Sequence, residues 1–222
     1  MNIIKTLYSL DTAELSDALD AIGIEGALFG ISQITSDIKM VGRAYTIKYE
    51  AYTKMPLSFQ NAGNYIDDVP EGSVLVIDNQ ARQDCTSWGD ILTRMALLKK
   101  LSGTVVHGAI RDHEFIKNAS YPVFASSIFM RSGKNRVYKA AEQCELVING
   151  VSIHPGDFIV GDSNGVVCIP FANVIDVIEK AINIKNAEFN IISAIKEGKT
   201  LREAREQYRY DQPWMKNEED VK

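Results

Sequence analysis

Residues 88–112 read WGDILTRMALLKKLSGTVVHGAIRD and predict one helix followed by one buried strand. Apolar residues recur at helical spacing from Ile91 to Leu101, and Ser102-Gly103 is typical of a helix end. The apolar, β-branched run 104–110 is typical of a strand covered on both faces. A helix over 90–102 would rise about 20 Å, and a strand over 104–110 would return about 23 Å. The two ends of this unit should therefore meet.

This geometry predicts that Arg111-Asp112 lies beside Gly89-Asp90. A helix start offers unpaired N–H groups and the positive end of the helix dipole. Together with the guanidinium it can hold a small anion, while Asp112 can hold a hard divalent cation next to it. The alternative is that Arg111 and Asp112 form an ordinary surface ion pair, which contributes little to stability.

The same residues resemble a known motif. Asp90, the twenty residues 91–110 and then Arg111-Asp112 resemble the Asp-x20-Arg-Asp motif of class II pyruvate aldolases. These are the 4-hydroxy-4-methyl-2-oxoglutarate/4-carboxy-4-hydroxy-2-oxoadipate aldolases, whose RraA-like relatives include the regulator of ribonuclease E activity A. Further segments resemble the same family: 42–46 (GRAYT), 71–78 (EGSVLVID), 122–125 (PVFA) and the predicted hairpin 155–170.

The resemblance implies an α/β fold. Members of the family have a three-layer β/β/α swivelling domain, which we expect over residues 1–170. A C-terminal helical extension is expected over 171–222, packing on the same domain or on a neighbouring subunit. The resemblance also implies a homo-oligomer, either a homotrimer or a hexamer built from trimers, with active sites between subunits.

The resemblance also implies a reaction and a set of roles. Such aldolases cleave a 4-hydroxy-2-oxo acid to pyruvate and a second oxo compound. Asp112 would bind Mg²⁺ or Mn²⁺, Arg111 would hold the pyruvyl carboxylate and keto oxygen, and Asp90 would orient a water on the metal. The backbone at the helix start would grip the carboxylate, at Gly89, Asp90, Ile91 and Leu92. Oxaloacetate decarboxylation is expected as a side activity, because loss of CO₂ leaves the same enolate.

A long helix is predicted over 171–197, between Pro170 and Gly198. It could simply pack on its own sheet. In the resembling family, a helix of this kind reaches the neighbouring subunit and contributes a glutamate to the metal's water shell. Glu188 matches that glutamate best, and Glu197 is the weaker candidate. Shorter helices are expected over 11–22, 57–66 and 200–210, the last opened by a capping box.

Two features depart from the motif or extend it. His107 stands where the family often has Asp, and it is either a buried, hydrogen-bonded histidine or a change in the surroundings of the site. The segment 128–139 is basic. It is either a solvated loop or a binding point for a substrate's distal carboxylate, through one of Arg131, Lys134, Arg136 and Lys139.

The composition limits the other classes of function. The net charge of −5 and pI near 5.3 argue against a nucleic-acid surface. The three cysteines lack CxxC spacing, and neither an apolar run of about 18 residues nor a signal-peptide pattern is visible, so we expect a cytoplasmic protein without a membrane partner. A methyltransferase would need a GxGxxG loop, which the sequence lacks. The remaining alternative is an RraA-like binding or regulatory protein without aldolase activity.

Overall fold

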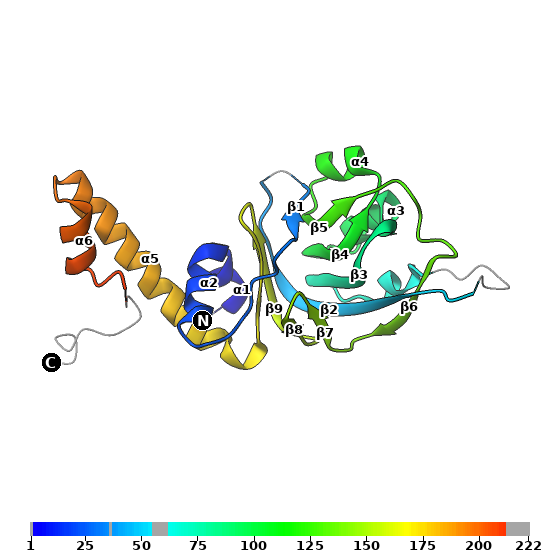
Figure 1. Ribbon diagram of the computed structural model, residues 1–222, viewed down its shortest axis with the longest axis horizontal. Coiled ribbons are helices and arrows are strands. Elements are labelled where there is room, and N and C mark those ends of the chain that lie inside the picture. The colour runs from blue at the N-terminus through cyan, green and yellow to red at the C-terminus, as the bar shows by residue number, and fades with distance from the viewer. Residues whose placement is uncertain (1, 36, 55–61, 212–222) are drawn as a thin grey trace. The chain divides into compact units, whose positions relative to one another are not determined.

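The computed structural model describes residues 2–35, 37–54 and 62–211. These residues form two compact units, and each is considered by itself. One unit comprises residues 26–171 and holds the β-sheet, and the other combines the chain up to residue 25 with the chain from residue 172 (Figure 1). We call them the sheet unit and the helical unit. The N-terminal helices, which were expected with the sheet domain, are thus grouped with the C-terminal helices.

The sheet unit is built on eight strands in the order β1-β5-β4-β3-β2-β9-β10, with β6 also paired to β2. The four central strands β5, β4, β3 and β2 are parallel. The connection from β3 to β4 is helix α3 (Asp90–Leu98), and that from β4 to β5 is helix α4 (His113–Asn118). The strands are β1 (Ser32–Gln33), β2 (Met40–Ala51), β3 (Ser73–Trp88), β4 (Gly103–Ile110), β5 (Val123–Ile128), β6 (Val137–Glu142), β9 (Phe158–Asp162) and β10 (Gly165–Ile169).

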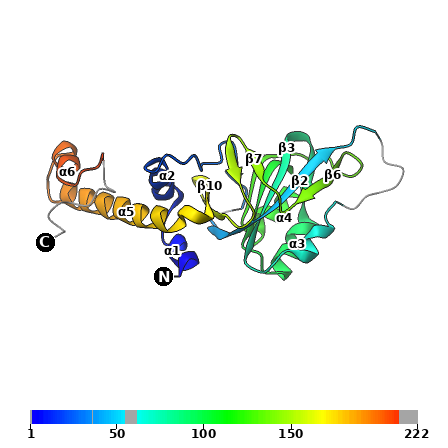
Figure 2. The same ribbon diagram turned by 90° about the horizontal axis from the view of Figure 1, so that it is seen from below.

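Both faces of this sheet are covered, which produces three layers. The hairpin of β7 (Leu146–Ile148) and β8 (Val151–Ile153) packs on one face, where Leu146 and Ile153 join Val76 and Val105 in a buried cluster. Helices α3 and α4 and the 3-10 helix η1 (Asn64–Asp68) cover the other face (Figures 1 and 2). The expected β/β/α architecture is confirmed, and it explains why β4 is buried along its whole length.

Strand β3 differs from the sequence prediction. A strand over 73–77 and a linker over 78–87 were expected, but the strand continues to Trp88. Its register with β4 shifts after Asp78, after Arg82 and after Thr86, and Gln80 and Ala81 have φ of 54° and 53°. Such bulges keep a polar, irregular segment attached to the neighbouring strand. The linker prediction was wrong because a strand is recognised in a sequence by its apolar residues, and the residues that continue this strand are mostly polar.

Helix α3 is shorter than predicted. It ends at Leu98 rather than at residue 102, and Lys100 then adopts a left-handed conformation with φ of 54°. The N–H of Leu101 donates to the Ala96 carbonyl at 3.0 Å, which closes the helix end. Residues 57–61 of the helix expected over 57–66 lie outside the described residues.

The helical unit contains α1 (Ile3–Tyr8), α2 (Thr12–Asp20), α5 (Val174–Lys196) and α6 (Leu201–Gln207). The helices predicted near 11–22, 171–197 and 200–210 are confirmed, and α1 is additional. Capping boxes open α2 and α6, at Asp11–Glu14 and Thr200–Glu203. Lys185 of α5 lies 3.2 Å from Glu14 of α2, so an ion pair ties the two helices together. Within the described ranges no helix has the length and apolarity needed to cross a membrane.

Candidate active site

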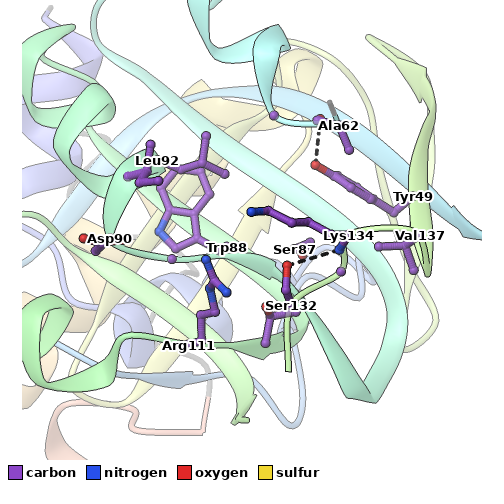
Figure 3. Close-up of a pocket in the computed structure, with 15 residues that line it drawn as sticks. Tyr49, Ala62, Ser87, Trp88, Asp90, Leu92, Arg111, Ser132, Lys134 and Val137 are labelled. Carbon is purple, nitrogen blue, oxygen red and sulfur yellow. Dashed lines mark hydrogen bonds between the residues drawn. The ribbon is translucent and has the colours of Figure 1, made fainter. Parts of the chain in front are cut away.

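A pocket of about 340 Å³ opens where β3 and β4 end (Figure 3). One wall is the end of β3 and the start of α3, from Thr86 to Leu92, and Arg111 follows β4. The opposite wall is the segment Ser132–Lys134 that precedes β6, together with Tyr49 and Val137. The pocket therefore lies outside the carboxyl ends of parallel strands, the usual position of ligand sites in such sheets.

The structure brings Asp90, Arg111 and Asp112 together. The backbone N–H of Asp90 donates to Asp112 Oδ2 at 3.0 Å, and Arg111 Nε lies 3.4 Å from the same oxygen. The backbone of Arg111 is fixed, because its N–H donates to the Trp88 carbonyl at 3.1 Å. The helix start and the strand end thus meet as the segment lengths predict, and Asp112 lies beside the pocket rather than among the residues that line it.

Asp112 is held in an unfavourable backbone conformation. Its φ of 57° and ψ of 37° are left-handed, which costs a residue with a side chain on the order of 1–2 kcal/mol. The residue precedes α4 but its side chain does not cap that helix; it turns back to the start of α3. Strain of this kind is retained where a side chain must be aimed at a site.

Gly89 makes this arrangement possible by close approach. A Cβ on Gly89 would lie 2.6 Å from Asp112 Oδ2 and 3.3 Å from Arg111 Cγ and Nε. A larger residue would displace the carboxylate or the guanidinium. Because the backbone of Gly89 is extended, space and not conformation is what requires glycine here.

The start of α3 is prepared to bind an anion. Gly89 provides no side-chain cap, and the N–H groups of Ile91 and Leu92 have no acceptor in the described part of the chain. The preceding peptide is fixed, because Trp88 Nε1 donates to Thr93 Oγ1 and that hydroxyl donates to the Gly89 carbonyl, both at 2.9 Å. This N-terminus can therefore present two oriented N–H donors beside Arg111.

The residues present fit a hard divalent cation held by one protein carboxylate. No cluster of three or more His, Cys, Asp or Glu side chains suited to a metal occurs among the described residues, which argues against a closed zinc-type cage in that part of the chain. Asp112 is about one-third exposed, at 35%, so one carboxylate oxygen can face water or substrate. Mg²⁺ is often held in this way, by one or two carboxylates with substrate and water completing its octahedron.

His107 lies on β4 and is not among the residues that line the pocket. It is buried, and its Nδ1 lies 2.8 Å from Asp78 Oδ1 of β3. Its Nε2 has no partner within the described ranges. The interpretation as a buried, hydrogen-bonded histidine is thus correct for one ring nitrogen and leaves the other unexplained.

Glu188 belongs to the helical unit, where it lines a second pocket of about 210 Å³ with Asp17, Asp20 and Asp211. Burial raises the pKa of its carboxyl group, and the negative charges of Glu14, Asp11 and Asp17 raise it further. Glu197, the weaker sequence candidate, is exposed at the end of α5. A catalytic role for either glutamate stays a prediction.

The basic segment separates into structural side chains and one that lines the pocket. Arg136 donates to the carbonyls of Ser132 and Lys134, Lys139 pairs with Glu142, and Arg131 stacks on Phe129. Lys134 is the member of the run that lines the pocket (Figure 3). The sequence analysis did not single out Tyr49, Ser87, Trp88 or Ser132 as pocket residues, because they become neighbours only through the extended β3.

Comparison with known proteins identifies related chains. The family model described as RraA-like, Aldolase/RraA, matches residues 12–168. DlpA of Legionella pneumophila is 53% identical over 214 residues, which cover 96% of this chain but only 35% of DlpA. A Halalkalibacterium halodurans protein with the provisional name 4-hydroxy-4-methyl-2-oxoglutarate aldolase is 31% identical and covers 82% of each chain. The solved structure of an uncharacterized Pseudomonas syringae protein is 42% identical, covers 91% of this chain and 96% of that one, and superposes with a TM-score of 0.84.

Proposed function

Because the chain belongs to the RraA-like Aldolase/RraA family, we propose that it is a divalent-metal-dependent lyase that cleaves a 4-hydroxy-2-oxo acid. The products would be pyruvate and a second oxo compound. The observation that carries this proposal is the contact at 3.0 Å between the Asp90 N–H and Asp112 Oδ2, with Arg111 beside it and the pocket in front.

The residues of the pocket can divide the reaction between them. Arg111 and the free N–H groups of Ile91 and Leu92 hold the carboxylate next to the keto group. Asp90, an acidic residue on the pocket wall, takes the proton of the C4 hydroxyl, directly or through water. The C3–C4 bond then breaks, its electron pair moves through C2 onto the keto oxygen, and Arg111 stabilises that negative charge. A proton added at C3 completes pyruvate.

Asp112 is the residue that would hold Mg²⁺ or Mn²⁺. When bound, the cation would supply Lewis-acid stabilisation of the enolate oxygen, which is worth several kcal/mol in metal-assisted reactions. Loss of CO₂ from oxaloacetate leaves the same enolate on the same residues, so oxaloacetate decarboxylation is part of the proposal.

The proposal extends to the assembly. We place the reaction in a homotrimer or hexamer in which Glu188 of one subunit joins the site of its neighbour. What supports this is the pKa of Glu188, which burial and neighbouring carboxylates raise above its usual value, and the resemblance of α5 to the helix that serves this purpose in related aldolases.

A second candidate is an RraA-like binding or regulatory protein without aldolase activity. DlpA, at 53% identity, carries a name that assigns it no chemistry, and the Halalkalibacterium halodurans relative, whose name assigns an aldolase, is 31% identical. A regulator would keep the fold and would not need the strained backbone at Asp112 or the close approach at Gly89. These two features favour the enzyme.

Pyruvate release separates the two candidates. The full chain, stripped of metal with EDTA and dialysed, is assayed with 4-hydroxy-2-oxoglutarate and oxaloacetate, with lactate dehydrogenase and NADH reporting pyruvate. We expect turnover only after Mg²⁺ or Mn²⁺ is restored. The spontaneous decarboxylation of oxaloacetate by metal alone is subtracted with the Asp112→Ala protein. Pyruvate formation that is insensitive to EDTA, or none from either substrate, would contradict the proposed lyase.

A further inference from the structure

A buried pair of polar side chains joins β3 and β4 before the two strands reach the pocket. His107 of β4 and Asp78 of β3 are each 8% exposed, and His107 Nδ1 lies 2.8 Å from Asp78 Oδ1. The same carboxylate oxygen accepts the N–H of Gln80 at 2.8 Å. Because an ionised carboxylate can only accept, we assign a ring proton to Nδ1 of His107. Neither member of the pair lines the pocket.

The pair stands where the regular pairing of β3 with β4 ends. The two strands pair in register as far as Asp78 and His107, and the residues of β3 from there to Thr86 then lie opposite a single short step of β4. The surplus residues 79–85, which we call the β3 excursion, end immediately before the pocket wall formed by Thr86–Gly89 (Figure 3). The position of that wall therefore depends on how the excursion is held.

The excursion begins with a strained turn. Gln80 and Ala81 have φ of 54° and 53°, a left-handed conformation that residues with side chains disfavour. Such residues keep it only where their surroundings determine the backbone. The bond from the Gln80 N–H to Asp78 closes a turn of the kind that aspartate forms with the backbone two residues further on. Asp78 therefore holds the strained turn, and His107 holds Asp78.

The rest of the excursion is packed against β4. The buried Asn79 Nδ2 donates to the Cys85 carbonyl at 3.4 Å, which links the two ends of the excursion. Gly108 approaches so closely that a Cβ there would lie 3.1 Å from Asn79 Cβ and 3.3 Å from the Arg82 carbonyl oxygen. Because close-packed segments transmit strain, a displacement where the excursion begins would reach the pocket wall where it ends.

The environment of Asp78 explains why a donor is needed at position 107. A buried carboxylate must be compensated by hydrogen bonds or by an opposite charge. In the described part of the chain, Asp78 receives hydrogen bonds from the Gln80 N–H and from His107. The second ring nitrogen of His107, Nε2, has no partner among the described residues. A side chain present only for packing would avoid that cost, so the bond to Asp78 is the feature that favours histidine here.

We propose that His107 is a positioning residue: by donating Nδ1–H to Asp78 it fixes the β3 excursion and thereby places the pocket wall. The wall passes its position on, because the Trp88 carbonyl accepts the Arg111 N–H at 3.1 Å and Gly89 begins helix α3. The consequence for catalysis rests on the proposed function. The consequence for the structure of the wall does not.

Substitutions at His107 separate its two nitrogens. Asparagine places an amide N–H near the position of Nδ1 and lacks Nε2, glutamine places its amide near Nε2, and leucine removes both donors. The readout is Trp88, which is 2% exposed in the wall, followed by acrylamide quenching of its fluorescence in a Trp214→Phe background. We expect quenching to rise at least about twofold in His107→Leu and His107→Gln, because the wall opens locally. His107→Asn should stay at the wild-type level.

The function should follow the same order. Affinity for Mn²⁺, measured by water relaxation, and kcat/KM for pyruvate release should fall about 10-fold in His107→Leu and His107→Gln, as for the loss of one hydrogen bond to a charged group. Both should be restored in His107→Asn. Asp78→Ala should match His107→Leu, and the double variant should be no worse than either, because the two residues act through one contact.

Thr104→Val is the matched control, because Thr104 Oγ1 and the Tyr121 hydroxyl form another buried pair, at 2.8 Å, near the start of β4. It should leave Trp88 quenching and Mn²⁺ affinity unchanged. Wild-type quenching in His107→Leu, a His107→Asn protein no better than His107→Gln, or the same losses in Thr104→Val would overturn the inference. If His107→Leu does not fold, the comparison of His107→Gln with His107→Asn decides. If Trp88 responds as expected but the wild type releases no pyruvate, the positioning role stands and only the proposed lyase fails.

Discussion

The sheet unit and the helical unit surround their acidic side chains with opposite environments. In the sheet unit, Asp112 accepts a backbone N–H and lies beside the Arg111 guanidinium. In the helical unit, Glu188 is raised in pKa by burial and then by three neighbouring carboxylates, and Lys185 only partly opposes them. The negative charge of Asp112 is compensated within its own unit, and that of Glu188 is not.

The difference indicates which unit has surface left for another molecule. Besides its uncompensated carboxylates, the helical unit exposes large apolar side chains on α5, among them Phe189 at 68% and Ile192 at 52%. Contiguous exposed apolar surface on a helix is typical of a protein interface. The comparison therefore agrees with the proposal that Glu188 acts in an assembly, whereas Asp112 is arranged within its own unit.

The largest effect is expected when the two proposed parts of the site are inactivated in different subunits. Asp112→Ala removes the proposed metal carboxylate, and Glu188→Ala removes the proposed contribution from the neighbour. We expect each variant alone to lose at least about 1000-fold in pyruvate release, in line with the loss of a metal-supplied charge stabilisation. Random mixing after co-expression would rebuild an intact pair at about one site in four, because each site draws one residue from each of two subunits.

The control for this mixture is a size measurement that shows the two variants in the same oligomer. Activity near a quarter of wild type would support a shared site. A mixture that assembles and stays inactive would rule it out, and so would full activity of Glu188→Ala alone.

A smaller effect is expected when the close approach between Gly89 and Asp112 in the sheet unit is disturbed. Gly89→Ala places a methyl group 2.6 Å from the present position of Asp112 Oδ2, so the carboxylate must move off the Asp90 N–H. We expect kcat/KM to fall about 10- to 100-fold, the equivalent of losing one charge-assisted hydrogen bond. Affinity for Mn²⁺, measured by water relaxation, should fall with it.

Thermal unfolding is the control for Gly89→Ala. The extended backbone of Gly89 accepts alanine, so the stability should drop by only about 1 kcal/mol, the cost of a poorer residue at the helix start. Unchanged activity would show that the position of Asp112 relative to α3 is not important for the reaction.

The sequence predicted the arrangement of Asp90, Arg111 and Asp112 in the sheet unit better than the rest of the molecule, for physical reasons. The run TVVHGAI is short and β-branched, which favours a buried strand, and the lengths of helix and strand then bring Arg111 next to Asp90. The extension of β3 could not be predicted, because its left-handed residues are Gln80 and Ala81 rather than the glycine or asparagine that usually indicates a bulge.

The residues that form the two walls of the pocket could not be predicted as neighbours from the sequence either. Ser87 and Lys134 are 47 positions apart and become neighbours through the bridge between Thr86 and Ser132, which no local pattern encodes. The basic run 131–139 raised the possibility of a carboxylate site, but charge alone could not distinguish Lys134 from three neighbours that have protein partners.

The smallest effect concerns the uncompensated carboxylate of the helical unit. The pKa of Glu188 is raised in the folded chain above its usual value of 4.5, so the folded state binds its proton more tightly than the unfolded state. Its contribution to stability is therefore fully present below about pH 4.5 and is lost as the pH rises through the raised pKa. Glu188→Gln keeps the shape and removes the charge, so at pH 7 it should raise the unfolding midpoint by about 1–2 °C. The gain should shrink as the pH is lowered towards 4.5, because wild-type Glu188 then becomes neutral too.

Glu197→Gln, at the exposed end of α5, is the matched control and should not show this pH-dependent gain. A destabilised Glu188→Gln protein at pH 7 would mean that the charge of Glu188 is already compensated, and the contrast between the two units would not hold.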